Sequence, residues 1–139
     1  MTANATPGNE AKASGRNLPV STKQSIELST FLRGKHVEHA RKLLREVIAH
    51  KRAVPYHQFN KDTGHKPGMA AGRYPKNTAS HLLKLINSCV SNAEYRGLSA
   101  ANLIIKHIAA QTGPTVWRYG RQRRRAKRTH IELIVAEKK

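Results

Sequence analysis

The sequence has little cysteine and no long apolar run. Cys89 is the one cysteine among 139 residues, which excludes a disulfide within the chain and a zinc site built from several cysteines. No run reaches the ~20 consecutive apolar residues of a membrane span, and residues 1–15 lack the apolar centre that a signal peptide requires. These absences predict a soluble, intracellular protein from a reducing compartment.

Acidic and aromatic side chains are also scarce. The chain has 8 Asp and Glu against 26 Lys and Arg, a formal net charge of +18, and aromatic residues make up only 5% of it. Apolar residues make up 38%, below the usual ~45–50%, so the sequence predicts a modest core. A positive charge of this size predicts a polyanionic partner. Among nucleic acid, anionic membrane and acidic protein, nucleic acid is the most common choice.

Three helices are predicted. The signals are residues that favour a helix start, apolar side chains at helical spacing and glycines that favour a helix end. The first begins at residues 21–22 and stops at Gly34. The second covers residues 37–48, where apolar side chains recur at three- and four-residue intervals. The third opens at Pro75 and stops at Gly97.

The N-terminal residues differ in composition from the rest of the chain. Residues 1–15 have almost no large apolar side chain, so they cannot offset the entropy of ordering. We therefore expect residues 1–15 to form a flexible tail and residues 16–139 to form a single domain.

After the third helix the hydrophobic period changes from 3.6 to 2. This change predicts strands over residues 103–110 and 131–136. An antiparallel pairing of the two places its centre at Gly120, which can supply the turn. The arms on either side would form a hairpin that extends about 30 Å at ~3.3 Å per residue, mostly outside the core.

This hairpin carries the strongest chemical signal in the sequence. Seven cations occur within residues 118–128, six of them arginine, and no acid occurs between Glu94 and Glu132. Arginine binds phosphate through paired hydrogen bonds, and aromatic side chains stack on unpaired bases. The predicted binding residues of the hairpin are Arg118, Arg121, Arg123, Arg124, Arg125, Lys127, Arg128, Trp117 and Tyr119.

Residues 50–74 form a second candidate surface. Their glycines, prolines and scattered cations predict a long irregular loop, which is uncommon in a compact domain unless a partner orders it. Glycine also lets the backbone approach phosphate closely. The predicted contacts are Arg52, His57, Lys61, Lys66, Arg73 and Tyr74.

Two alternatives remain at the level of the residues alone. A small basic ribonuclease could use His57 or His65 as general base beside Lys66. A free nucleic-acid-compacting protein would also be basic, although the chain shows no repeated or symmetric basic face. We expect no catalytic residue, no metal ligand and no cofactor, because carboxylates are few and the pair His36 and His39 lacks a third ligand at a sensible spacing.

Several short motifs resemble one known family. They are Asn-Ala-Glu-Tyr-Arg-Gly-Leu at residues 92–98, Ile-Lys-His-Ile-Ala-Ala at 105–110 and Arg-Thr-His-Ile-Glu-Leu at 128–133. This set is similar to the large-subunit ribosomal protein L-twenty-two family. Val-Pro-Tyr at residues 54–56 and Gly-Arg-Tyr-Pro at 72–75 resemble its archaeal and eukaryotic branch, and the archaeal type fits best.

The resemblance covers residues 20–137 and implies an α+β fold. In it, three helices pack on a small three-stranded antiparallel sheet, and a protruding basic β-hairpin penetrates large-subunit ribosomal RNA. By position, residues 112–129 would be the extended hairpin and residues 50–74 an irregular RNA-contacting loop. The segment between Gly113 and His130 is several residues shorter than is usual in the family.

The same resemblance implies a function and partners. The protein would be a cytoplasmic, structural constituent of the large ribosomal subunit that binds ribosomal RNA, assists assembly and forms part of the wall of the nascent-peptide exit tunnel. Its partners would be large-subunit ribosomal RNA, neighbouring large-subunit proteins and the nascent peptide. No membrane partner, no homo-oligomer and no enzymatic activity are expected.

Overall fold

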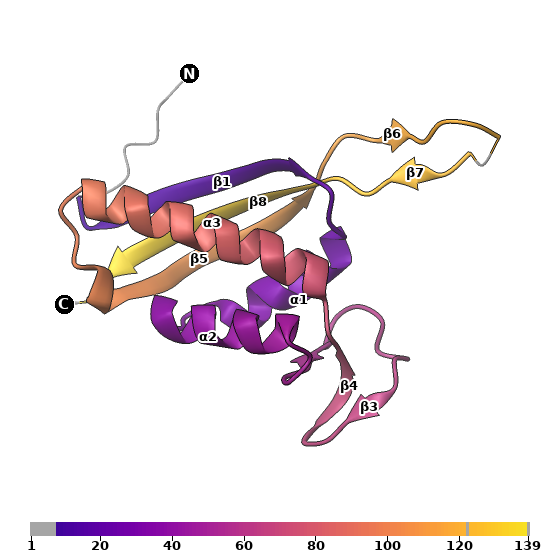
Figure 1. Cartoon of the computed structure of the whole chain (residues 1–139), viewed down its shortest axis with the longest axis horizontal. Helices are drawn as coiled ribbons and strands as arrows, with labels where there is room; N and C mark the ends of the chain where they lie inside the picture. Colours follow the sequence, from indigo (N-terminus) through magenta and orange to yellow (C-terminus); the bar gives the residue numbers. More distant parts are fainter. Residues whose placement is uncertain (1–7, 122, 139) are drawn as a thin grey trace.

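The computed structural model describes residues 8–121 and 123–138, and it is an α+β fold (Figure 1). In chain order its elements are β1 (Glu10–Leu18), α1 (Thr22–Leu32), α2 (Val37–Ile48), β2 (Val54–Pro55), β3 (His65–Lys66), β4 (Met69–Arg73), α3 (Lys76–Tyr95), the short 3-10 helix η1 (Ala100–Asn102), β5 (Leu103–Thr112), β6 (Val116–Trp117), β7 (Arg125–Ala126) and β8 (Thr129–Glu137).

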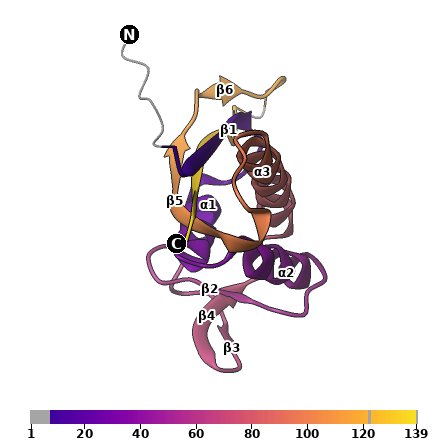
Figure 2. The same ribbon diagram turned by 90° about the vertical axis from the view of Figure 1, so that its left-hand side faces the viewer.

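The main sheet is antiparallel, with strand order β1-β8-β5, and the helices cover one of its faces (Figure 2). Helix α3 packs on β1 and β8, α1 packs on β5, and α2 packs against α3. Alternate residues of β8, namely Ile131, Leu133 and Val135, are fully buried beneath the helices. The predicted fold class, three helices on a three-stranded antiparallel sheet, is confirmed.

The helices lie where the sequence pattern places them. Helix α2 has the predicted bounds, and α3 begins at Lys76, with Pro75 as the residue that caps its start. The stops at Gly34 and Gly97 both have positive φ, of 76° and 78°. A residue with a side chain adopts this conformation only at a cost, so glycine at these two positions ends the helices efficiently.

The expectation of a flexible tail over residues 1–15 is wrong for residues 10–15. These residues belong to β1 and pair with β8, from Glu10 opposite Ala136 to Gly15 opposite Ile131. Ala11 and Ala13 point into the core beneath α3. Because alanine side chains are small, they give a weak hydrophobic signal, yet they fit where helix and sheet approach closely. Residues 1–7 lie outside the described residues.

The expectation of an irregular loop over residues 50–74 is wrong for residues 54–55, 65–66 and 69–73, which form strands. This segment contains a second antiparallel sheet of order β2-β4-β3, in which Val54 pairs with Arg73 and His65 with Ala71. Val54 and Tyr56 are buried in the core. The sequence pattern misses these strands because β2 and β3 have only 2 residues each, too few to show a period.

Strands β5 and β8 pair along their length and then separate into the hairpin. Near the C-terminus Leu103 pairs with Glu137, a register centred on the predicted residue 120. A bulge between Ile105 and His107 shifts this register, and the outer pair, Val116 with Ala126, is centred on residue 121. The turn therefore lies one position later than the sequence predicts.

Candidate nucleic-acid interface

The two basic surfaces leave the body in the right half of Figure 1, the hairpin toward the top and the sheet β2-β4-β3 toward the bottom. The hairpin, defined here as residues 113–128, leaves the main sheet beyond the pair formed by Thr112 and Thr129. The sheet β2-β4-β3 with its connecting turns, residues 54–73, projects from the helical side, and we call it the clamped loop. The C-terminus of β8 lies at the opposite end (Figure 1).

The root of the hairpin is fixed to the start of α1. The hydroxyl of Thr129 is fully buried, donates to the carbonyl of Val20 at 2.9 Å and lies 2.8 Å from the hydroxyl of Thr22. The N–H of Gly113 donates to the carbonyl of Arg128 at 2.9 Å. A Cβ at Gly113 would lie 2.9 Å from the carbonyl carbon of Arg128, so the arms approach closer than any other residue allows.

Beyond the root the arms are exposed and held by few contacts. The N–H of Arg118 donates to the carbonyl of Arg124 at 2.8 Å, and the Arg125 guanidinium lies 4.9 Å from the centre of the Trp117 ring. Trp117 is 56% exposed and Tyr119 is fully exposed. Exposed rings on a basic arm are suitable platforms for stacking with bases.

The predicted hairpin cations all lie on this projection without an acidic partner. Within residues 8–121 and 123–138, no ion pair involves a hairpin cation. Exposed side chains belong to Arg118, Arg121, Arg123, Arg124, Arg125 and Lys127, whereas Arg128 is half-buried. Their mutual repulsion is therefore relieved only by solvent ions or by an external anion.

A buried carboxylate organises the clamped loop. Glu27 of α1 is 2% exposed, and its two oxygens accept hydrogen bonds from the backbone N–H groups of His57, Gln58 and Phe59 at 3.1, 2.9 and 2.7 Å. A carboxylate that receives three backbone donors is well satisfied despite its burial. The sequence gives no hint of this contact, because Glu27 is separated from its partners by a whole helix.

The predicted residues of the loop region have different surroundings. Arg52 is paired with Glu46 at 2.6 Å. Lys66 lies 5.8 Å from the centre of the Tyr74 ring, which also contacts His50. The side chains of His57, Lys61 and Arg73 are also exposed, and the positive charge of Arg73 acts to lower the pKa of the buried Tyr56.

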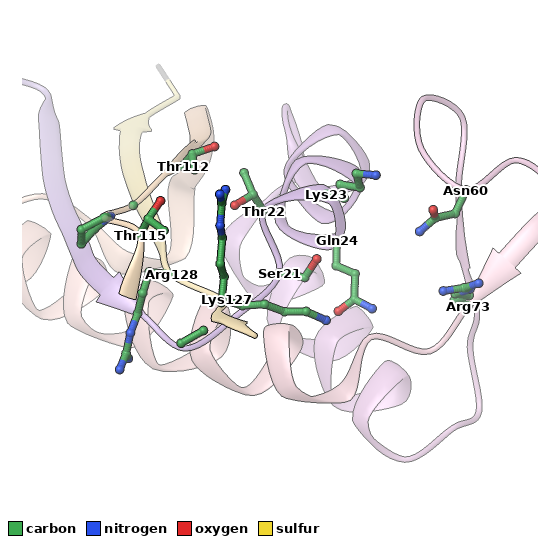
Figure 3. Close-up of a pocket in the computed structure, with 14 residues that line it drawn as sticks. Ser21, Thr22, Lys23, Gln24, Asn60, Arg73, Thr112, Thr115, Lys127 and Arg128 are labelled. Atoms are coloured by element: carbon green, nitrogen blue, oxygen red, sulfur yellow. The ribbon is translucent and has the colours of Figure 1, made fainter. Parts of the chain in front are cut away.

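A hollow of about 530 Å³ lies between the hairpin root and the clamped loop (Figure 3). It brings Arg73 from the loop to the same site as three predicted hairpin cations. Sequence reasoning missed the residues that α1 and the connecting turn contribute to it. The lining residues are Ser21, Thr22, Lys23, Gln24, Asn60, Arg73, Thr112, Gly113, Pro114, Thr115, Arg125, Ala126, Lys127 and Arg128.

Burial favours the neutral forms of two titratable side chains, Cys89 and Tyr56. Burial raises the pKa of the Cys89 thiol to about 11, and its Sγ donates to the carbonyl of Ala11. Burial also raises the pKa of Tyr56 to about 12. Within the described residues, no cluster of three or more His, Cys, Asp or Glu side chains could hold a metal ion, and no helix is long and apolar enough to cross a membrane.

Comparison with known proteins gives a consistent result. The model of the family described as ribosomal protein L22p/L17e matches residues 13–136. The large ribosomal subunit protein uL22 of Archaeoglobus fulgidus is 43% identical over 112 residues, which cover 78% of this chain and 72% of that protein. The uL22 proteins of Methanocaldococcus jannaschii and Cenarchaeum symbiosum are 39% and 38% identical, each over 94% of this chain and at least 90% of their own length.

Proposed function

Because the chain belongs to the ribosomal protein L22p/L17e family and is of the archaeal type, we propose that it binds large-subunit ribosomal RNA through the hairpin and the clamped loop. Membership makes the chain a structural component of the large ribosomal subunit, located with it in the cytoplasm. It also removes the ribonuclease alternative, since the family is structural and not enzymatic.

The observation that carries this proposal is the unpaired charge of the hairpin. Seven cations with no acidic neighbour project away from the core on an arm that has no buried residue among those described. A fold retains such an arm where a polyanion neutralises it, and arginine at six of the seven positions favours phosphate. Trp117 and Tyr119 add two exposed rings for contact with unpaired bases.

The finer part of the proposal concerns assembly and the exit tunnel. An arm that extends roughly 25 Å beyond the sheet, at ~3.3 Å per residue, is long enough to insert between RNA segments and hold them together during assembly. We place its tip in the wall of the nascent-peptide tunnel, near the peptide. The part of the helical side that lies away from the clamped loop then faces neighbouring large-subunit proteins.

Sedimentation of cell extract through a sucrose gradient, before and after a high-salt wash, tests RNA insertion. We expect the protein to migrate with the large subunit and to stay there after the wash, because an inserted arm is not released by screening alone. A variant that lacks residues 114–127, joined by a two-residue turn, should bind but wash off. Release of the unmodified protein by the wash would contradict an inserted hairpin.

A further inference from the structure

The hollow at the hairpin root is lined by cations from three separate segments. Lys23 comes from α1, Arg73 from β4, and Arg125, Lys127 and Arg128 from the returning arm of the hairpin. No Asp or Glu is among the described residues that line it. Four of these cations, Lys23, Arg73, Arg125 and Lys127, have exposed side chains and line one hollow without a carboxylate. Solvent ions or a negatively charged ligand would offset their repulsion.

The side chains that face one another come from the two RNA-binding surfaces. In Figure 3, Lys127 extends past Ser21 toward Gln24, while Arg73 and Asn60 lie on the far side of the same hollow. Arg128 points away from this centre (Figure 3). Its guanidinium donates a hydrogen bond to the carbonyl of Asn17 at 3.5 Å. Arg128 therefore stabilises the hairpin root and does not extend toward the centre of the hollow.

The start of α1 lines part of the hollow. Ser21, Thr22, Lys23 and Gln24 form the start of α1, whose first turn has no acidic residue and whose N-cap side chain makes no capping bond. The first N–H groups of a helix have no partner within the helix, and they favour a negative charge. The first N–H groups of α1 therefore add to the positive potential of the cations that line the hollow.

The composition of the walls indicates the kind of anion. No aromatic ring is among the lining residues described, so the hollow offers charge and donors but no stacking surface for a base. Lysine, arginine, amide and hydroxyl donors together are the set that contacts the sugar–phosphate backbone. The cations of the hollow lie on opposite sides of it. An extended nucleic-acid backbone can contact both sides at once, because its phosphates follow one another along the chain.

We propose that this hollow is a phosphate site, in which Arg73 and Lys127 hold the same stretch of RNA backbone against the start of α1. This proposal rests on the proposed RNA-binding function, and it deepens it: the hairpin root and the clamped loop are two sides of one site, not separate contacts. RNA held there would fix the direction of the hairpin relative to the body.

Ethylation of single phosphates in large-subunit ribosomal RNA tests the site. Phosphates whose ethylation blocks binding would be mapped for the unmodified protein and for Arg73→Ala, Lys127→Ala and the double variant. We expect both single variants to lose interference at the same one or two adjacent phosphates. Each should weaken binding about fivefold to tenfold, and the double variant should lose less than the product.

Two controls separate this site from the general function. Lys42→Ala removes an exposed cation of α2 that is not among the lining residues, and it should leave the phosphate map unchanged. Arg121→Ala at the hairpin tip should weaken binding but affect different phosphates. If Arg73→Ala and Lys127→Ala change separate phosphates and their effects multiply, the shared site is wrong while RNA binding stands. If the unmodified protein binds no RNA, the proposed function and this inference both fail.

Discussion

The hairpin and the clamped loop are both basic and leave the body in the right half of Figure 1, one toward the top and one toward the bottom, but they are held in different ways. The clamped loop has Val54, Tyr56 and Ala71 buried against the body, and its turn is bound by the carboxylate of Glu27. The hairpin has no buried residue among those described. The clamped loop is held by buried contacts with the body, and the hairpin beyond its root is held by contacts between its own arms.

This difference has an energetic consequence. The cost of ordering the clamped loop is offset within the protein by buried side chains and by hydrogen bonds to Glu27. Among the described residues, the hairpin is ordered by a few backbone hydrogen bonds between its arms and by the contact of Arg125 with Trp117, against the repulsion of seven cations. Binding through the loop should therefore cost little entropy, whereas binding through the hairpin includes the cost of ordering the arm.

Glu27→Gln should have the largest effect on folding. The amide nitrogen would face backbone N–H groups of residues 57–59, so at least one buried donor loses its acceptor. We expect a loss of about 2–4 kcal/mol in the free energy of unfolding. Thermal and urea denaturation measure the loss, and hydrogen exchange should show the amides of residues 57–59 opening first.

Glu38→Gln is the matched control for this change. Glu38 is exposed and pairs with Arg41 one turn along α2, a pair that contributes at most about 0.5 kcal/mol. Equal stability losses in the two variants would mean that Glu27 does not organise the clamped loop, and the contrast between the two surfaces would disappear.

The double variant Arg121→Ala and Arg123→Ala should act on binding and leave folding unchanged. Both side chains are exposed near the tip, far from the core. Removal of two phosphate contacts should lower the slope of log affinity against log salt by about 2 and weaken binding roughly tenfold to a hundredfold near physiological salt. Filter binding to large-subunit RNA at several salt concentrations gives the slope.

The same titration with Arg52→Ala compares the hairpin with a predicted contact that lies next to the clamped loop. Since Arg52 is already paired with Glu46, Arg52→Ala should lower the slope by less than one unit. An unchanged slope in the hairpin variant, or an equal fall in both, would contradict the assignment of the main phosphate contacts to the hairpin.

Gly113→Ala probes the root of the hairpin, where its two arms approach closely. The added methyl group would lie within 3.0 Å of Arg128 backbone atoms, which cannot move without disturbing the bond from Gly113 to the Arg128 carbonyl. We expect a loss of about 1–2 kcal/mol in stability and weaker RNA binding from a displaced arm. Gly120→Ala at the tip, where φ is 85°, should cost stability only locally and spare the root.

The elements predicted from the sequence are those in which apolar residues recur at regular intervals. The elements that were missed depend on contacts between residues far apart in the sequence. Helix α2 and strands β5 and β8 have regular apolar spacing, so their positions followed from the pattern. The short strands of the clamped loop and the strand at Glu10–Leu18 have no such spacing. The clamped loop is held by the buried carboxylate of Glu27, and the strand at Glu10–Leu18 packs through two small alanines. Tertiary contacts alone define them.

The residues of the candidate site also divide into those that the sequence predicted and those that only the structure revealed. Charge runs identified the hairpin cations directly, since consecutive arginines are visible in the sequence. The sequence could not reveal that Arg73 and Lys127 line one hollow with Lys23, because three segments must fold together first. The surroundings of Arg52 and Lys66, which contact Glu46 and Tyr74, also became visible only in the structure.

Trp117→Ala should have the smallest effect on folding. A small effect would support the difference between the hairpin, which lies outside the core, and the clamped loop, which is held by the body. Trp117 is 56% exposed and contacts Arg125 from the partner arm, an exposed cation–π pair of about 0.5–1 kcal/mol within the hairpin. Because the hairpin is not part of the core, we expect the main thermal transition to shift by less than ~2 °C. Faster hydrogen exchange should be confined to residues 116–126. Trp117→Phe keeps a ring and should restore most of the protection. If Trp117→Ala instead lowers the main transition as much as Glu27→Gln does, the hairpin unfolds together with the core, and the two surfaces are held by one cooperative structure.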